Sequence, residues 1–126
     1  MADKPFRRFF DNIEQLDIFA RGLFHLACVD GIVEEERAVI REFLEDMGEP
    51  DLMESLDKVA FDPRMLALAL ETTNLRRLFL KTGLLLVYAD GVFSAEEREA
   101  IDLIAEVLGL TRALPEIESE MKDVSL

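Results

Sequence analysis

The chain has 126 residues, 50% of them hydrophobic, and its 27 Asp and Glu oppose 14 Lys and Arg to give a formal net charge of −13. A chain of this length buries roughly two thirds of its unfolded surface in one core, so we expect a single domain over residues 1–126. The negative charge repels nucleic-acid phosphates, which argues against a nucleic-acid partner and favours cations or basic proteins.

Two further features bear on where the protein acts. A single cysteine forms no internal disulfide, and no charged-then-apolar signal segment opens the chain, so we expect a cytoplasmic protein. The uncharged stretch from Thr82 to Ala89 is far shorter than the ~20 residues of a membrane span, and no span is expected.

Helices are predicted along the chain, because apolar residues recur at steps of three and four and no segment alternates like a half-buried strand. The predicted fold class is all-α, a compact bundle of about seven helices. Gly48 is a suitable stop for the second helix, and Ser94 with Glu97 is a capping-box signature at the start of the sixth. The helices are expected at about residues 12–31, 34–47, 50–59, 63–70, 74–91, 95–109 and 115–122.

One motif occurs twice, at residues 29–37 and 89–98: an Asp-Gly pair followed by Glu-Glu-Arg. With one extra residue in the second loop the match continues to the end of the next helix, where Gly48 falls on Gly109. This predicts two internally repeated helix-turn-helix hairpins, at about residues 12–48 and 74–109.

Four acidic residues of these hairpins are predicted to face inward. At ~100° per residue, Glu36 and Glu97 fall on the apolar sides of their helices, and Asp30 and Asp90 face inward at the ends of the preceding ones. An Asp in a last helical turn is disfavoured by about 0.3–1 kcal/mol unless something compensates it. If the hairpins pack side by side, two carboxylates about 5 Å apart repel by roughly 3 kcal/mol at an effective dielectric near 20. A bound cation would relieve this repulsion, and oxygen ligands favour Ca²⁺ or Mg²⁺.

The same four residues also suit a purely structural interpretation, and the sequence leaves both open. An Asp before Gly commonly accepts hydrogen bonds from the following turn, and a Glu at the third helical position commonly reaches back to the cap. Residues 90–97 match the second half of an EF-hand loop, but Leu86 and Tyr88 stand where its first two acidic ligands belong, so a true EF-hand is not expected.

The doubled Asp-Gly and Glu-Glu-Arg motif on paired helices resembles the tellurite-resistance TerB-like family over about residues 20–109. Residues 88–98 match more closely than the first copy, in which Val29 replaces the usual Ala and the loop is shorter. The resemblance implies a bundle of about seven helices and a module that also occurs attached to other domains, including a co-chaperone. It also implies a divalent-cation site formed by Asp30, Glu36, Asp90 and Glu97.

Three classes of function follow. The first is a non-catalytic cytoplasmic module, related to stress or tellurite resistance, that binds a divalent cation; the second is a metal-free helical adaptor for a protein partner. The third is a magnesium-dependent all-α nucleotide pyrophosphohydrolase. It rests on a loosely similar acidic spacing whose members lie on solvated faces: Glu42, Glu45, Glu99 and Asp102. No serine, cysteine or histidine constellation supplies a nucleophile and its base, so an enzyme is not expected.

Two other groups of residues could bind a metal ion or a partner. His25 and Cys28 have metal-friendly spacing on one helix, but the chain holds no other His or Cys to complete a soft site, and structural roles are expected, with Cys28 at the edge of the core. The N-terminal segment interleaves basic and aromatic residues, which suits a segment folded onto the bundle, a partner-docking arm or contact with a membrane surface. Its members are Lys4, Phe6, Arg7, Arg8, Phe9 and Phe10.

Overall fold

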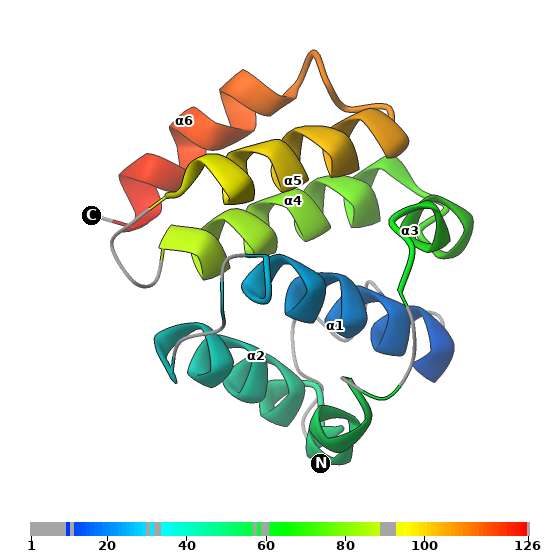
Figure 1. Cartoon of the computed structure of the whole chain (residues 1–126). Coiled ribbons are helices and arrows are strands. Elements are labelled where there is room, and N and C mark those ends of the chain that lie inside the picture. Colours follow the sequence, from blue (N-terminus) through cyan, green and yellow to red (C-terminus); the bar gives the residue numbers. More distant parts are fainter. Residues whose placement is uncertain are drawn as a thin grey trace.

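The computed structural model describes residues 10, 12–29, 31, 34–56, 58, 61–88 and 93–125, the last four of these by their backbone only. Every regular element in these ranges is helical, as predicted for an all-α bundle (Figure 1). The elements are α1 (Ile13–Ala27), α2 (Glu34–Asp46), the 3₁₀ helix η2 (Pro50–Ser55), α3 (Arg64–Ala69), α4 (Thr73–Tyr88), α5 (Ala95–Val107) and α6 (Leu114–Ser125).

Local signals begin and end several of these helices. The Asn12 side chain accepts a hydrogen bond from the Gln15 amide at the start of α1, and Ser94 and Glu97 form the predicted capping box at the start of α5. Gly48 and Gly109 follow α2 and α5 with positive φ angles of 78° and 74°. These are the left-handed positions at which helices commonly stop.

Three predicted boundaries differ from the structure, and a fourth, the end of the fifth helix at Gly91, lies outside the described residues. The first helix ends at Ala27 and not at Gly31, because the chain leaves the helix after Cys28, whose amide still bonds to Phe24 and His25. The segment that begins at Pro50 is a 3₁₀ helix ending at Ser55. The last helix is longer than predicted and runs over Leu114–Ser125.

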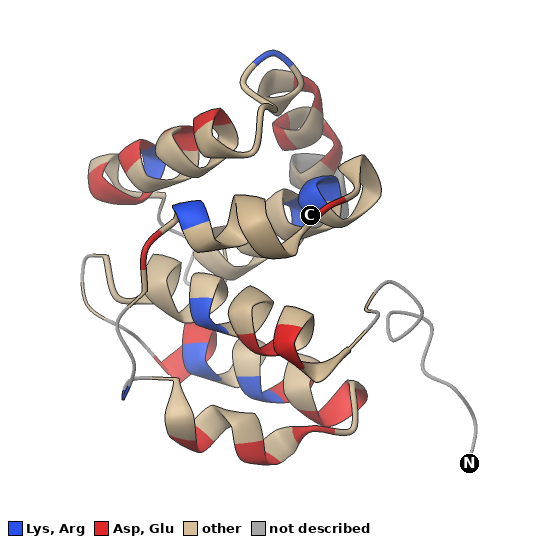
Figure 2. Ribbon diagram, turned by 90° about the vertical axis from the view of Figure 1, so that its right-hand side faces the viewer, with Lys and Arg blue, Asp and Glu red and all other residues tan. Residues whose placement is uncertain are grey.

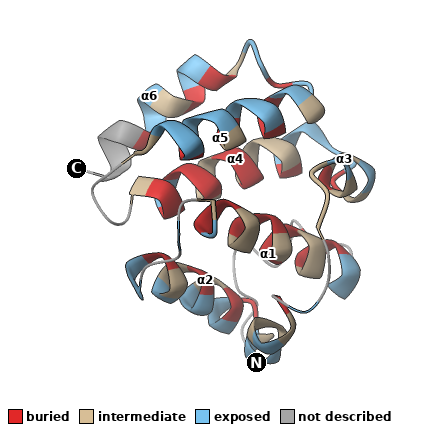
Figure 3. Cartoon of the chain, viewed as in Figure 1, coloured by how far each residue is buried: buried red, intermediate tan, exposed pale blue. Residues whose placement is uncertain are grey.

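The centre of the bundle is formed by α1 and α4 (Figure 1). Helix α1 packs on α2, α3 and α4, whereas α4 also packs on α5 and α6, and η2 packs on α2. Buried positions face these helix interfaces, and exposed positions lie on the outer sides of α2, α5 and α6 (Figure 3). Acidic residues are distributed over several helices and are not confined to one patch (Figure 2).

An aromatic cluster fills the interface of α1, α2 and α4. The Phe19 ring is fully buried, stacks on Phe43 with 5.2 Å between ring centroids, and meets Phe10 and Phe79 edge-on at 5.1 Å. Such pairs add about 0.5–1.5 kcal/mol each to the burial of their area. The cluster therefore joins the first hairpin to the first helix of the second.

Arg76 of α4 connects the ends of two other helices. Its guanidinium donates to the carbonyl oxygens of Leu70 at 2.7 Å, Ala67 at 3.0 Å and Leu108 at 3.2 Å. Those carbonyls lie at the carboxyl ends of α3 and α5, where the last carbonyls of a helix lack intrahelical donors and the helix dipole is negative. The Arg76 side chain thus supplies hydrogen-bond donors to the last carbonyls of both helices.

The two hairpins have similar proportions: α1 and α2 contain 15 and 13 residues, and α4 and α5 contain 16 and 13. Their superposition as true repeats stays a prediction. Within the described residues, no helix is long and apolar enough to cross a lipid bilayer.

Candidate functional site

The two hairpins place the ends of their first helices and the starts of their second helices on the same side of the bundle. In Figure 1, α1 and α4 both end at the left, and α2 and α5 both begin there. The predicted ligands Glu36 and Glu97 lie in the first turns of α2 and α5, so the packing of α1 against α4 places both residues on this side of the molecule.

Glu36 is fully buried, as its position on the apolar side of α2 predicted. Its neighbours Glu34 and Glu35 are exposed in the same helical turn, where a negative charge meets the positive end of the helix dipole. The Oε2 atom of Glu36 is also buried. Only this one of the three glutamates is taken out of water, which requires electrostatic compensation if the carboxylate is ionised.

Glu97 is equally enclosed, with 1% of its surface exposed. Its Oε1 atom accepts a hydrogen bond from the Ser94 amide at 2.9 Å, and its own amide donates to the Ser94 hydroxyl at 3.1 Å. The predicted capping box is thereby confirmed. The second carboxylate oxygen, Oε2, is buried as well.

The other two predicted ligands, Asp30 and Asp90, lie outside the described residues. Among the residues that are described, no three His, Cys, Asp or Glu side chains form a group able to hold a metal ion. A calcium ion takes 6–8 oxygen ligands and a magnesium ion takes octahedral coordination. A site built on Glu36 and Glu97 therefore needs oxygens from the turns that precede α2 and α5.

The exposed acidic residues considered for an enzymatic magnesium site lie on solvated faces of α2 and α5, as the helical periodicity predicted. Asp102 lies 3.8 Å from the Nε of Arg98, its neighbour one turn earlier. The exposed residues of the set are Glu42, Glu45, Glu99 and Asp102.

His25 and Cys28 have different surroundings. The imidazole of His25 is half-buried against the ring of Phe61, with 5.2 Å between centroids, and this burial lowers its pKa below the usual 6.5. Cys28 is exposed, so its expected place at the edge of the core is wrong. Its backbone caps the end of α1, where the chain leaves the helix.

Tyr88 is a feature of this side of the molecule that the sequence did not single out. Helical periodicity places it with Arg77 and Lys81 on a polar edge, yet its hydroxyl is buried and meets no hydrogen-bond partner in the described part of the chain. Its ring lies edge-on to Phe93 at 5.4 Å. Burial raises the pKa of the phenol, and the nearby Glu118 carboxylate raises it further.

Comparison of the chain with protein-family models, curated proteins and solved structures finds no match.

Proposed function

We propose that this protein is a non-catalytic TerB-like binding module that takes up a divalent cation, Ca²⁺ or Mg²⁺, where its two hairpins begin α2 and α5. The observation that carries the proposal is the burial of the matched pair: Glu36 is 0% exposed and Glu97 is 1% exposed. The adjacent glutamates Glu35 and Glu96 are exposed. Of the two glutamates that the duplicated motif aligns in each hairpin, the first is exposed and the second is buried.

The energetic argument is that an ionised carboxylate is costly to bury. The effective penalty is several kcal/mol per ion, and it is offset only by a close opposite charge or by well-formed hydrogen bonds. A divalent cation supplies both a charge and a strong bond to oxygen. The expected ligand set remains Asp30, Glu36, Asp90 and Glu97.

The remaining parts of the proposal come from the residues of the chain. The doubled motif at residues 29–37 and 89–98 resembles that of the TerB-like family, and this resemblance implies a stress-related role. We assign the module to the cytoplasm, since Cys28 is an exposed thiol and the chain has no second cysteine to pair with it.

A titration with Ca²⁺ and with Mg²⁺ tests the cation. Binding to the folded state alone stabilises it by about 2.7 kcal/mol at a hundredfold excess over the dissociation constant, so millimolar ion should raise the melting temperature and EDTA should reverse the rise. Amide shifts should be localised at the first turns of α2 and α5. Sodium chloride at equal ionic strength controls for screening of the −13 net charge.

The variants Glu36→Gln and Glu97→Gln should lose the ion-dependent gain, because an amide keeps the shape of the side chain and removes its charge. Glu96→Gln is the matched control, since Glu96 is exposed in the same turn as Glu97. Equal melting temperatures with ion and with EDTA, together with no localised shifts, would remove the cation from the proposal.

A metal-free adaptor is the second candidate, and the capping box favours it. The reciprocal hydrogen bonds between Ser94 and Glu97 cap the start of α5, so the buried Glu97 carboxylate stabilises the helix without an ion. Under this alternative, Glu97→Gln should lower stability equally with and without Ca²⁺.

A further inference from the structure

A groove is lined by the start of α1 and by α3. Both segments lie at the end of the bundle opposite the starts of α2 and α5 (Figure 1). It is about 400 Å³ in volume. Its apolar lining comes from Ile18 on α1 and from Met65, Leu68 and Ala69 on α3. Leu68 is 81% exposed, the highest value among the large apolar residues described.

A hydrogen bond joins the two walls of the groove. The side-chain amide nitrogen of Gln15 donates to the carbonyl oxygen of Ala69 at 3.1 Å, which ties α1 to the end of α3. Gln15 itself is buried. A preformed site loses less conformational entropy when a ligand binds, so this contact favours docking without rearrangement.

The charges around the groove are of one sign. Glu14 on α1 and Glu71 after α3 line it, and no Lys or Arg does. Within the described residues, neither of these two glutamates forms an ion pair, whereas the nearby cation Arg64 is held by Asp62 and Arg21 by Asp17. An apolar hollow with unneutralised acids at its rim matches a ligand that combines apolar and basic side chains.

We infer that the groove between α1 and α3 docks a basic amphipathic segment of a protein partner. Its apolar side chains enter the hollow beside Leu68 and Met65, and its Lys or Arg residues meet Glu14 and Glu71. This is the helix-in-groove mode of recognition, in which apolar anchors supply affinity and the charges at the rim supply orientation and rate. The net charge of −13 steers such a segment toward the protein. The inference does not depend on a cation at the hairpins.

The test uses the isotopically labelled full chain in EDTA and two synthetic helical peptides. One peptide carries Leu at helical spacing flanked by Lys, and the other replaces each Lys by Glu. We expect the Lys peptide to shift amides at the start of α1 and along α3, and the Glu peptide to bind at least tenfold more weakly. Affinity for the Lys peptide should fall with rising salt.

Three variants locate the site. Leu68→Glu and the double variant Glu14→Lys/Glu71→Lys should each weaken binding of the Lys peptide at least tenfold, and their melting temperatures verify that they fold. Leu103→Glu is the matched control: Leu103 is 50% exposed on α5, and this change should leave binding unaltered. Equal loss in the control, or shifts centred elsewhere, would overturn the inference.

Two other occupants are outcomes of the same experiment. If the Lys peptide binds the double variant Arg7→Glu/Arg8→Glu and not the parent chain, the N-terminal segment of this chain competes for the groove and the inference fails. If sedimentation shows a dimer that Leu68→Glu dissociates, a second copy fills the groove and the inference also fails. Absence of binding to every form refutes it outright.

Discussion

At the scale of single residues, the buried hydroxyl of Tyr88 is a group whose removal should not harm the protein. Among the described residues this hydroxyl has no hydrogen-bond partner, so its burial removes its hydration without a bond in return. We expect Tyr88→Phe to leave the free energy of unfolding unchanged or to raise it by up to about 1 kcal/mol in urea denaturation. Tyr88→Leu, which removes the ring contact with Phe93, should lower it. A loss above 1 kcal/mol for the Phe variant would mean that the hydroxyl forms a stabilising bond.

The single histidine of the chain should make stability depend on pH near neutrality. Burial lowers the folded-state pKa of His25 below 6.5, so between these two pKa values the unfolded chain binds a proton that the folded chain does not. The free energy of unfolding should therefore fall as the pH drops below about 6.5, and His25→Gln should remove this part of the dependence. The imidazole resonances should titrate with a midpoint below 6.5, and a midpoint at or above that value would contradict burial as the dominant influence.

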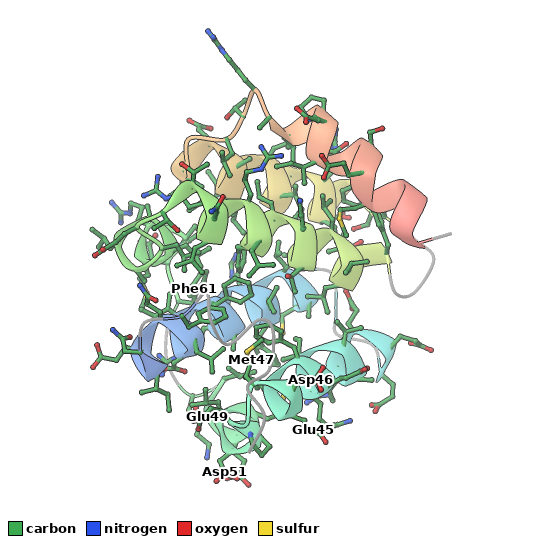
Figure 4. All side chains as sticks on the ribbon, turned by 180° about the vertical axis from the view of Figure 1, so that it is seen from behind. Glu45, Asp46, Met47, Glu49, Asp51 and Phe61 are labelled. Atoms are coloured by element: carbon green, nitrogen blue, oxygen red, sulfur yellow. The ribbon has the colours of Figure 1, made fainter. Side chains whose placement is uncertain are left out.

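At the scale of the helices, α2 carries an unfavourable charge at its carboxyl end. Glu45 and Asp46 lie in its last turn, which contains no basic residue, and Glu49 and Asp51 follow in the next segment (Figure 4). These acids face the negative end of the helix dipole. Between them, Met47 turns into the core, where it is 4% exposed.

Asp46→Lys should consequently raise the free energy of unfolding by about 0.3–1 kcal/mol, since it places a cation at the carboxyl end of α2. Glu35→Lys, in the exposed first turn of the same helix, should lower it by a similar amount. Both variants change the net charge equally, so relief of the general negative repulsion is the same in each. If chemical denaturation shows that both variants change the free energy of unfolding in the same direction, then the net charge and not the helix dipole determines the effect.

The crossing of α1 and α4 depends on two glycines that lack side chains where the helices meet. A Cβ on Gly22 would lie 2.7 Å from the Phe79 ring and 3.1 Å from Leu66, whereas one on Gly83 would lie 2.8 Å from a terminal methyl of Leu26. Phe79 is fixed in the aromatic cluster by Phe19, but the end of a leucine side chain is able to rotate.

Gly22→Ala should therefore destabilise the protein by about 1–3 kcal/mol, as overpacking of a core does. Gly83→Ala should cost less, because both variants gain about 1 kcal/mol in helix propensity but the methyl of Leu26 is able to move away from the new Cβ. Urea denaturation of both variants measures the order, and a larger loss for Gly83→Ala would contradict the rigid role assigned to Phe79.

At the scale of the whole molecule, the helices were predictable because their signals act over a few residues. Caps at Asn12 and at Ser94 with Glu97 act within one turn, and the stops at Gly48 and Gly109 use a backbone conformation that glycine adopts readily. The end of the first helix at Ala27 was not predictable in this way, since the positive φ of Gly31 serves the loop beyond it.

The sequence predicted which side chains of the candidate site face inward, but not how far apart they lie. Helical periodicity placed Glu36 and Glu97 on apolar faces, and both are buried. Periodicity within α4 did not predict the surroundings of Tyr88, because they come from other parts of the chain: its ring meets Phe93, which precedes α5, and its pKa is raised by Glu118 of α6. Distances between hairpins depend on how α1 and α4 pack, which a pattern within one helix does not encode.

The three carbonyls gathered by Arg76 also have a consequence for the dynamics of the bundle. A helix of six residues such as α3 is too short to persist by itself, so its amides would exchange with solvent through frequent local opening. The guanidinium from α4 holds Ala67 and Leu70 of this helix end together with Leu108 at the end of α5. Unravelling either end breaks bonds that the other shares, so α3 belongs to the same cooperative opening unit as α4 and the end of α5, and its exchange protection reflects that unit and not its own length.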